Sequence, residues 1–144
     1  MVNRVWDKEN KYKEGFLKEY KYWVLEVSHS QNTLGCYIIF AKREIERISQ
    51  LTTEEINELK DVMKNVEEVL MKTTELNPDR FNYLQLGNIL HHLHFHGIPR
   101  YKSVRKFAGK DWVDTTWGNP PVWSQTKVGD DLVIKLRKLI KKNL

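Results

Sequence analysis

Three histidines at alternate positions are the residues of this chain best suited to chemistry. His92, His94 and His96 lie within the segment LHHLHFHGIPRY. Alternate residues of a β-strand share one face, so a strand here would present the three imidazoles together and turn Leu93 and Phe95 into an apolar layer. Three neighbouring neutral imidazoles need polar partners that a plain core rarely supplies. The pattern therefore favours a functional site over a structural role.

Two kinds of chemistry are consistent with these histidines. Imidazole is a common transition-metal ligand, and alternate strand positions can converge on one ion. No HExxH or CxxC motif accompanies the run, however. Alternatively, one neutral imidazole, with an unperturbed pKa of about 6.5, attacks phosphorus to form a phosphoramidate that water then releases. The flanking imidazoles, protonated in part, would then neutralise phosphate oxygens or protonate a leaving oxygen.

The elements that must position these histidines follow from the hydropathy pattern. We predict four strands, at residues 20–28, 36–40, 80–86 and 91–98. The first two are separated by a short polar connection, which indicates an antiparallel pair. Pro99 should end the last ladder or place its final residue at an edge.

A long helix is predicted over residues 52–75, because Thr52 and Glu55 have capping-box spacing. One face of this helix is expected in the core, with apolar residues at the helical period: Ile56, Leu59, Val62, Met63, Val66, Val69 and Leu70. Asp130 and Asp131 open a final amphipathic helix with apolar residues on one side: Leu132, Leu136, Leu139 and Ile140. Strands on both sides of a long helix predict an α+β domain with a mainly antiparallel sheet.

Length and composition predict one globular domain over residues 1–144. We interpret 1–19 as an irregular or partly helical arm, 102–128 as a surface loop pinned by tryptophans, and 125–144 as a basic C-terminal helix. Hydrophobic residues make up 40% and charged residues 30% of the chain, which excludes a disordered protein. No apolar run is long enough to cross a membrane, and the N-terminus lacks the core of a signal peptide. With a single cysteine, Cys36, the expected location is the cytoplasm.

The net charge of +5 favours an anionic partner such as a phosphate ester or nucleotide. Most of the excess lies near the C-terminus, at Lys135, Arg137, Lys138, Lys141 and Lys142. We interpret this cluster as the solvated face of a helix with dipole-favourable charges, rather than as a nucleic-acid or lipid surface.

The segment from His92 to Tyr101 resembles the signature of the histidine-triad (HIT) superfamily of nucleotide hydrolases and transferases, His-φ-His-φ-His-φ-φ, often followed by Pro-Arg. The resemblance implies a HIT-like fold. It extends to LGCYIIFAKRE with ISQLTTEE and to FNYLQLGN, and it covers roughly residues 20–124. The stretch around WGNPPVW is similar to the tail of small prokaryotic members described as diadenosine tetraphosphate hydrolase-like.

The resemblance implies a role for each histidine. His94 would be the nucleophile on the α-phosphorus and would form a nucleotidyl-histidine intermediate. His96 would contact the phosphate and assist the leaving group. His92 would orient the triad and help to bind phosphate. Asn88, four residues earlier, occupies a position where relatives carry a phosphate-holding side chain, and Asn82 is a weaker candidate for the same pocket.

Further binding residues are implied less directly. Arg100, with Lys42 and Arg43, either steers a polyphosphate or is an ordinary surface charge. Trp123 is expected to cover the site, and the nucleoside cleft is expected to draw on the strand residues Trp23, Val24, Leu25 or Val27. His91 should point away from the triad.

Two departures from the family pattern stand out. Gly97 replaces a bulky apolar residue and marks a bulge or a close backbone approach. Many relatives have the sequence Pro-Lys-x-His where this chain has Ala41-Lys42-Arg43-Glu44. Glu44 therefore occupies the place of a fourth, supporting histidine. The Glu44 carboxylate either accepts a hydrogen bond from a triad imidazole or repels phosphate. His29 either supplies a replacement imidazole or is a solvated surface residue.

The resemblance implies an enzyme that acts on dinucleoside polyphosphates or nucleoside phosphoramidates. No cofactor is required by the nucleophilic step, and Mg²⁺ is expected only as the companion of a polyphosphate substrate. A homodimer is expected, with no membrane or nucleic-acid partner. Two alternatives stay open: a nucleotide-binding module with little turnover, and a metal-dependent hydrolase that uses the same histidines.

Overall fold

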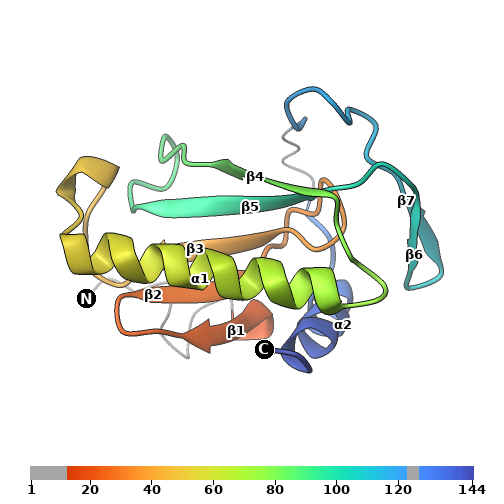
Figure 1. The fold of residues 1–144 in the computed structure, drawn as a ribbon, viewed down its shortest axis with the longest axis horizontal. Coiled ribbons are helices and arrows are strands. Elements are labelled where there is room, and N and C mark those ends of the chain that lie inside the picture. The colour runs from red at the N-terminus through yellow and green to blue at the C-terminus, as the bar shows by residue number, and fades with distance from the viewer. Residues whose placement is uncertain (1–12, 123–126) are drawn as a thin grey trace.

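A five-stranded antiparallel sheet forms the centre of the protein in the computed structural model, which describes residues 13–122 and 127–144. The strand order is β1-β2-β3-β5-β4. The strands are β1 (Phe16–Glu19), β2 (Trp23–Val27), β3 (Tyr37–Ala41), β4 (Arg80–Leu84) and β5 (His94–Arg100). The helix α1 (Thr53–Lys72) crosses one face of this sheet (Figure 1). The arrangement confirms the predicted α+β class with a mainly antiparallel sheet.

The helix α1 begins as its sequence predicts. The Thr52 side chain accepts a hydrogen bond from the Glu55 amide, and the Glu55 carboxylate accepts one from the Thr52 amide, which completes the capping box. The predicted core face is correct except at Ile56, which is 48% exposed. Glu55 is buried in its place because Arg43 binds its carboxylate in a bidentate pair.

The strand that carries the histidines is shifted relative to its prediction. It begins at His94 rather than at residue 91, and it continues through Pro99 to Arg100. A proline fits there because β3 pairs only with residues 94–97, so no strand needs the missing amide. The Pro99 carbonyl faces this open side and accepts a hydrogen bond from the Thr33 hydroxyl at 2.5 Å.

Gly97 marks a close approach rather than a bulge, since the β3–β5 and β4–β5 registers are continuous. A Cβ atom at this position would lie 2.1 Å from Cε2 of Tyr37, the residue opposite on β3. The Tyr37 hydroxyl is hydrogen-bonded to the Tyr83 hydroxyl at 2.6 Å, and Tyr83 donates to the Glu67 carboxylate at 2.6 Å. This chain of contacts holds the Tyr37 ring over the strand, so the position requires glycine.

Two further segments differ from their predictions. The arm assigned to 1–19 contributes the 3-10 turn η1 (Lys13–Gly15) and the edge strand β1, while its first 12 residues lie outside the described residues. The segment predicted as a loop, 102–128, contains a hairpin of β6 (Arg105–Phe107) and β7 (Lys110–Trp112). Ala108 and Gly109 form its turn with φ of 54° and 70°, and an alanine with positive φ is a weak hairpin signal in a sequence.

The C-terminal helix α2 (Asp130–Lys141) contacts η1, β1 and β2. Its buried residues, Val133, Leu136 and Ile140, join the same core as α1. The 3-10 turn η2 (Ile48–Gln50) precedes α1. Within the residues that the structure describes, no helix is long and apolar enough to cross a membrane.

Candidate active site

The pairing of β3 with β5 places two of the three histidines on one face of the sheet. His94 lies opposite Phe40, and His96 lies opposite Ile38. Leu93 and Phe95 belong to the core under α1. The predicted alternation is therefore correct for His94 and His96, which lie on the face that α1 does not cover.

A cavity of about 620 Å³ opens above these two histidines. Its walls come from five parts of the chain: the segment after β2, the strand β3, the segment between β4 and β5, the strand β5, and the segment that leads into α2. The lining residues are Ser28, His29, Ser30, Ile38, Phe40, Leu86, Gly87, Asn88, Ile89, Leu90, His94, His96 and Lys127. The cavity thus combines an apolar floor with imidazoles, hydroxyls and one lysine.

The His94 ring is held in one orientation with one nitrogen already engaged. Its Nδ1 lies 2.5 Å from the main-chain carbonyl oxygen of His92, so Nδ1 carries the proton and donates to that oxygen. The ring stacks on Phe40, with centroids 5.5 Å apart and planes at 26°. Burial lowers the pKa of His94, which keeps the ring neutral at pH 7. The lone pair is therefore on Nε2.

His96 stands edge-on to His94, with ring centroids 4.9 Å apart. Its pKa is lowered to about 4, chiefly by burial and further by the neighbouring His94 and Lys127. In the ligand-free site, His96 is therefore neutral at pH 7 rather than partly protonated. A bound phosphate would raise this pKa, because an adjacent anion favours the imidazolium form.

His92 precedes β5 and is not among the residues that line the cavity. Its ring Nε2 lies 2.5 Å from the carbonyl oxygen of Ala41, at the end of β3. The Ala41 amide donates to the Leu93 carbonyl at 3.1 Å, and the Leu93 amide donates to the Ile45 carbonyl at 2.7 Å. These bonds fix the main-chain carbonyl that orients His94, so His92 is placed to position the triad.

Of the other residues predicted to bind substrate, some line the cavity and some lie elsewhere. Asn88 lines the cavity, whereas Glu44 is exposed and is not among the lining residues. Asn82 and Arg100 instead line a separate cavity of about 360 Å³, together with Trp117 and its neighbours. Trp123 lies outside the described residues. His91, which was predicted to point away from the triad, is exposed and does not line the cavity.

Arg100 is a buried structural residue. It is 3% exposed, and its guanidinium makes a bidentate ion pair with Asp114 at 2.6 and 3.1 Å. The remaining N–H groups donate to the Asn82 side chain and to the carbonyls of Asn119 and Thr116. All five donors of the guanidinium are thereby engaged. Lys42 and Arg43 are likewise paired with Glu19 and Glu55.

The strand residues expected in the nucleoside cleft are buried elsewhere. Trp23, Leu25 and Val27 belong to the core, and Val24 is fully buried without lining the cavity. The wall is formed instead by the residues that follow this strand, of which the sequence singled out only His29.

Lys127 was missed because it lies beyond a long segment with little periodicity. Its only sequence signal is a positive charge just before the acidic start of the final helix.

The three triad imidazoles do not form a ligand set in this arrangement. Among the described residues, one group of three His, Cys, Asp or Glu side chains has all its ligand atoms within 4.8 Å of one another. That group is Glu14, His29 and Asp130, and it contains none of the triad.

Comparisons with known proteins agree on one family. The family model described as HIT domain matches residues 10–103. A histidine-triad (HIT) protein of Sinorhizobium meliloti is 21% identical, with 92% of this chain and 91% of that chain covered and a TM-score of 0.69. A hypothetical histidine triad nucleotide-binding protein of Sulfolobus tokodaii is 20% identical, with 89% and 81% covered and a TM-score of 0.67.

A further solved structure, the diadenosine triphosphate hydrolase of Plasmodium falciparum in complex with cyclomarin A, is 15% identical. The alignment covers 90% of this chain and 76% of the Plasmodium chain, with a TM-score of 0.65. At these identities the likeness concerns the fold. The comparison with curated proteins gave no significant match.

Proposed function

Since this chain belongs to the HIT domain family, whose members bind or hydrolyse nucleotides, we propose that it is a nucleotide hydrolase or nucleotidyl transferase. His94 is the nucleophile and attacks the α-phosphorus. The observation that carries this proposal is the hydrogen bond from His94 Nδ1 to the His92 carbonyl, which leaves Nε2 as the nitrogen with a lone pair. Burial keeps the same ring neutral, as nucleophilic attack requires.

The reaction proceeds in two steps. The lone pair of His94 Nε2 forms a bond to the α-phosphorus, and the bond from phosphorus to the leaving oxygen or nitrogen breaks. His96, protonated once the anionic substrate raises its pKa, gives its proton to the leaving atom. Water, or another acceptor in a transferase, then displaces His94 from phosphorus and releases the nucleotide.

The substrate classes that we propose are dinucleoside polyphosphates and nucleoside phosphoramidates. Phe40 and Ile38 offer apolar surface to a base, as do the exposed Leu86, Ile89 and Leu90. Lys127 and Asn88 are available to phosphate oxygens. The nucleophilic step needs no metal, and Mg²⁺ enters only with a polyphosphate. The active species is a homodimer in the cytoplasm.

A second candidate function is a nucleotide-binding module with little turnover. It is favoured by Glu44, which replaces the supporting histidine of the family pattern and is exposed outside the cavity lining. Tight binding of adenosine or guanosine monophosphate in calorimetry, with no hydrolysis of any polyphosphate or phosphoramidate, would favour this module over the enzyme.

The test is the variant His94→Ala assayed on a dinucleoside polyphosphate and a nucleoside phosphoramidate. We expect turnover to fall by about a thousandfold or more, because the atom that forms the bond is removed. The matched control is His91→Ala, which removes an exposed neighbouring imidazole and should retain full activity. Circular dichroism checks that both variants fold.

Two measurements complete the test. Labelled nucleotide should remain attached to the wild-type protein after rapid denaturation and be released by acid, as a phosphoramidate bond is acid-labile. Activity should survive treatment with a chelator when a phosphoramidate is the substrate. Undiminished turnover in folded His94→Ala would refute the nucleophilic role, and loss of activity with the chelator would indicate a metal-dependent hydrolase.

A further inference from the structure

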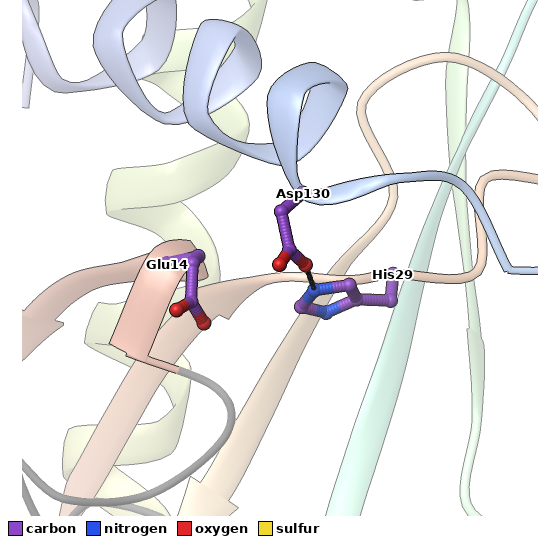
Figure 2. A group of neighbouring side chains, drawn as sticks. All are labelled: Glu14, His29 and Asp130. Carbon is purple, nitrogen blue, oxygen red and sulfur yellow. Dashed lines mark hydrogen bonds and ion pairs between the residues drawn. The ribbon is translucent and has the colours of Figure 1, made fainter.

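A second cluster of ligand-type side chains lies beside the candidate active site. Glu14 comes from η1, His29 follows β2, and Asp130 begins α2. Figure 2 shows the three side chains together, with the His29 ring bonded to the Asp130 carboxylate. Three segments that are far apart in sequence thus bring one imidazole and two carboxylates to one place.

The spacing of these groups suits a coordination sphere. One ligand atom from each residue lies within 4.8 Å of the other two, and His29 Nε2 lies 3.1 Å from Asp130 Oδ1. Metal–ligand bonds of about 2.0–2.2 Å in tetrahedral geometry place neighbouring ligand atoms about 3.4 Å apart. Closing these distances from at most 4.8 Å to about 3.4 Å would bring all three atoms to bonding distance of one ion. The His29 side chain is 13% exposed, which limits the freedom it would lose on binding.

The carboxylates of this cluster are not neutralised by basic side chains of the described residues, which favours the binding of a cation. Within the described residues, no lysine or arginine forms an ion pair with Glu14 or Asp130. Glu26 adds a third carboxyl group close by. It is 1% exposed, and its Oε2 atom has no hydrogen-bond partner among the described residues.

We propose that Glu14, His29 and Asp130 bind a divalent transition-metal ion of the Zn²⁺ class, with water completing its coordination. A single imidazole with two carboxylates suits Zn²⁺ better than Mg²⁺, which favours oxygen ligands and retained water. His29 and its neighbours Ser28 and Ser30 also line the active-site cavity. The ion therefore ties that wall of the cavity to α2 and η1. This proposal does not depend on the proposed function.

The experiment is titration calorimetry of ZnCl₂ into the untagged, chelator-treated full chain. We expect one site that is weakened at least tenfold in Asp130→Asn and in His29→Gln, since loss of even an outer-shell partner costs about 10–100-fold in metal affinity. Asp130 is 66% exposed in its side chain, so Asp130→Asn should fold normally. Zn²⁺ should raise the melting temperature of the wild type and not that of Asp130→Asn.

Three controls separate this site from other zinc ligands. Asp131→Asn removes the neighbouring acid of the same helix turn, and His91→Gln removes an exposed imidazole that lies 4.0 Å from Glu46. The double variant His94→Asn/His96→Asn removes the triad rings from the cavity. All three should retain the zinc site. Unchanged affinity in Asp130→Asn and His29→Gln, or loss of binding in the triad variant, would overturn the proposal.

Discussion

The two ends of β5 present polar side chains of similar burial with different consequences. His94 at one end is 6% exposed, and Arg100 at the other is 3% exposed. Every donor of Arg100 is engaged by protein groups, whereas the hydrogen bond of His94 Nδ1 leaves Nε2 toward a cavity of about 620 Å³. The comparison teaches that a ring nitrogen left without a protein hydrogen bond, rather than residue type or burial, separates a candidate reactive position from an architectural one.

The largest expected effect is at the arginine end. Arg100→Met leaves the Asp114 carboxylate, 3% exposed, buried without its partner, and should lower the free energy of unfolding by about 3–5 kcal/mol. Urea denaturation measures this change. The double variant Arg100→Met/Asp114→Asn should recover part of the loss. Catalytic activity per folded molecule should stay the same, and a selective loss of activity would place Arg100 in the site after all.

The middle of the strand separates the two ends and should be nearly as sensitive. Gly97→Ala forces a methyl group against the Tyr37 ring and should cost about 1–3 kcal/mol of unfolding free energy. In a Tyr37→Leu background the same change should cost less, because the obstructing ring is absent. Equal costs in the two backgrounds, measured by urea denaturation, would show that the Tyr37 ring is not the obstacle.

Acid should weaken the two ends in different pH ranges. The pKa of His96 is about 4 in the folded protein against about 6.5 when unfolded, so the unfolded state binds the extra proton and stability falls as the pH drops from 6.5 to 4. The pKa of Asp114 is lowered: burial, the largest single influence, raises it, but the hydrogen bonds and charge of Arg100 outweigh burial. Stability from the Asp114 pair is therefore present above its ordinary pKa of 3.8 and is lost only below it.

Urea denaturation at pH 7.5 and pH 5 measures the difference between these ranges. Between these two pH values the free energy of unfolding should fall less in His96→Asn than in the wild type. The difference corresponds to the uptake of at most one proton by the unfolded wild type. An identical pH dependence in the two proteins would rule out His96 as its source.

The smallest effect concerns the cation at the histidine end. Lys127→Gln should weaken the binding of a nucleoside monophosphate by about fivefold, since one exposed charge on an anion contributes about 1 kcal/mol. The matched control is Lys138→Gln, on the exposed side of α2, which changes the net charge equally. Calorimetry at low salt checks both. Equal affinities for the two variants would exclude a specific role for Lys127.

Much of the fold could be predicted because its signals are local. The capping box at Thr52, the strand pair and the alternation of His94 with Phe95 each depend on a few neighbouring residues. Ile56 was misplaced for a different reason, because the burial of Glu55 depends on Arg43, twelve residues away. A period of apolar residues carries no information about such a partner.

The site could be predicted only in part, because its walls come from distant segments. His94, His96 and Asn88 are close in sequence, whereas Ser28 and Lys127 reach the same cavity through the sheet and the start of α2. Arg100 was a plausible phosphate ligand by its type and position. Its use by Asp114, Asn82 and the 116–119 segment is a tertiary property that no short motif encodes.

The alanine at position 41 has a consequence for the rigidity of the triad. Its amide donates to the Leu93 carbonyl, immediately before the strand that bears His94. A proline at position 41 would have no amide hydrogen to give. The Ala41 amide therefore adds one main-chain hydrogen bond between the end of β3 and the segment that leads into His94, beside the bonds of the His92 ring and the Leu93 amide.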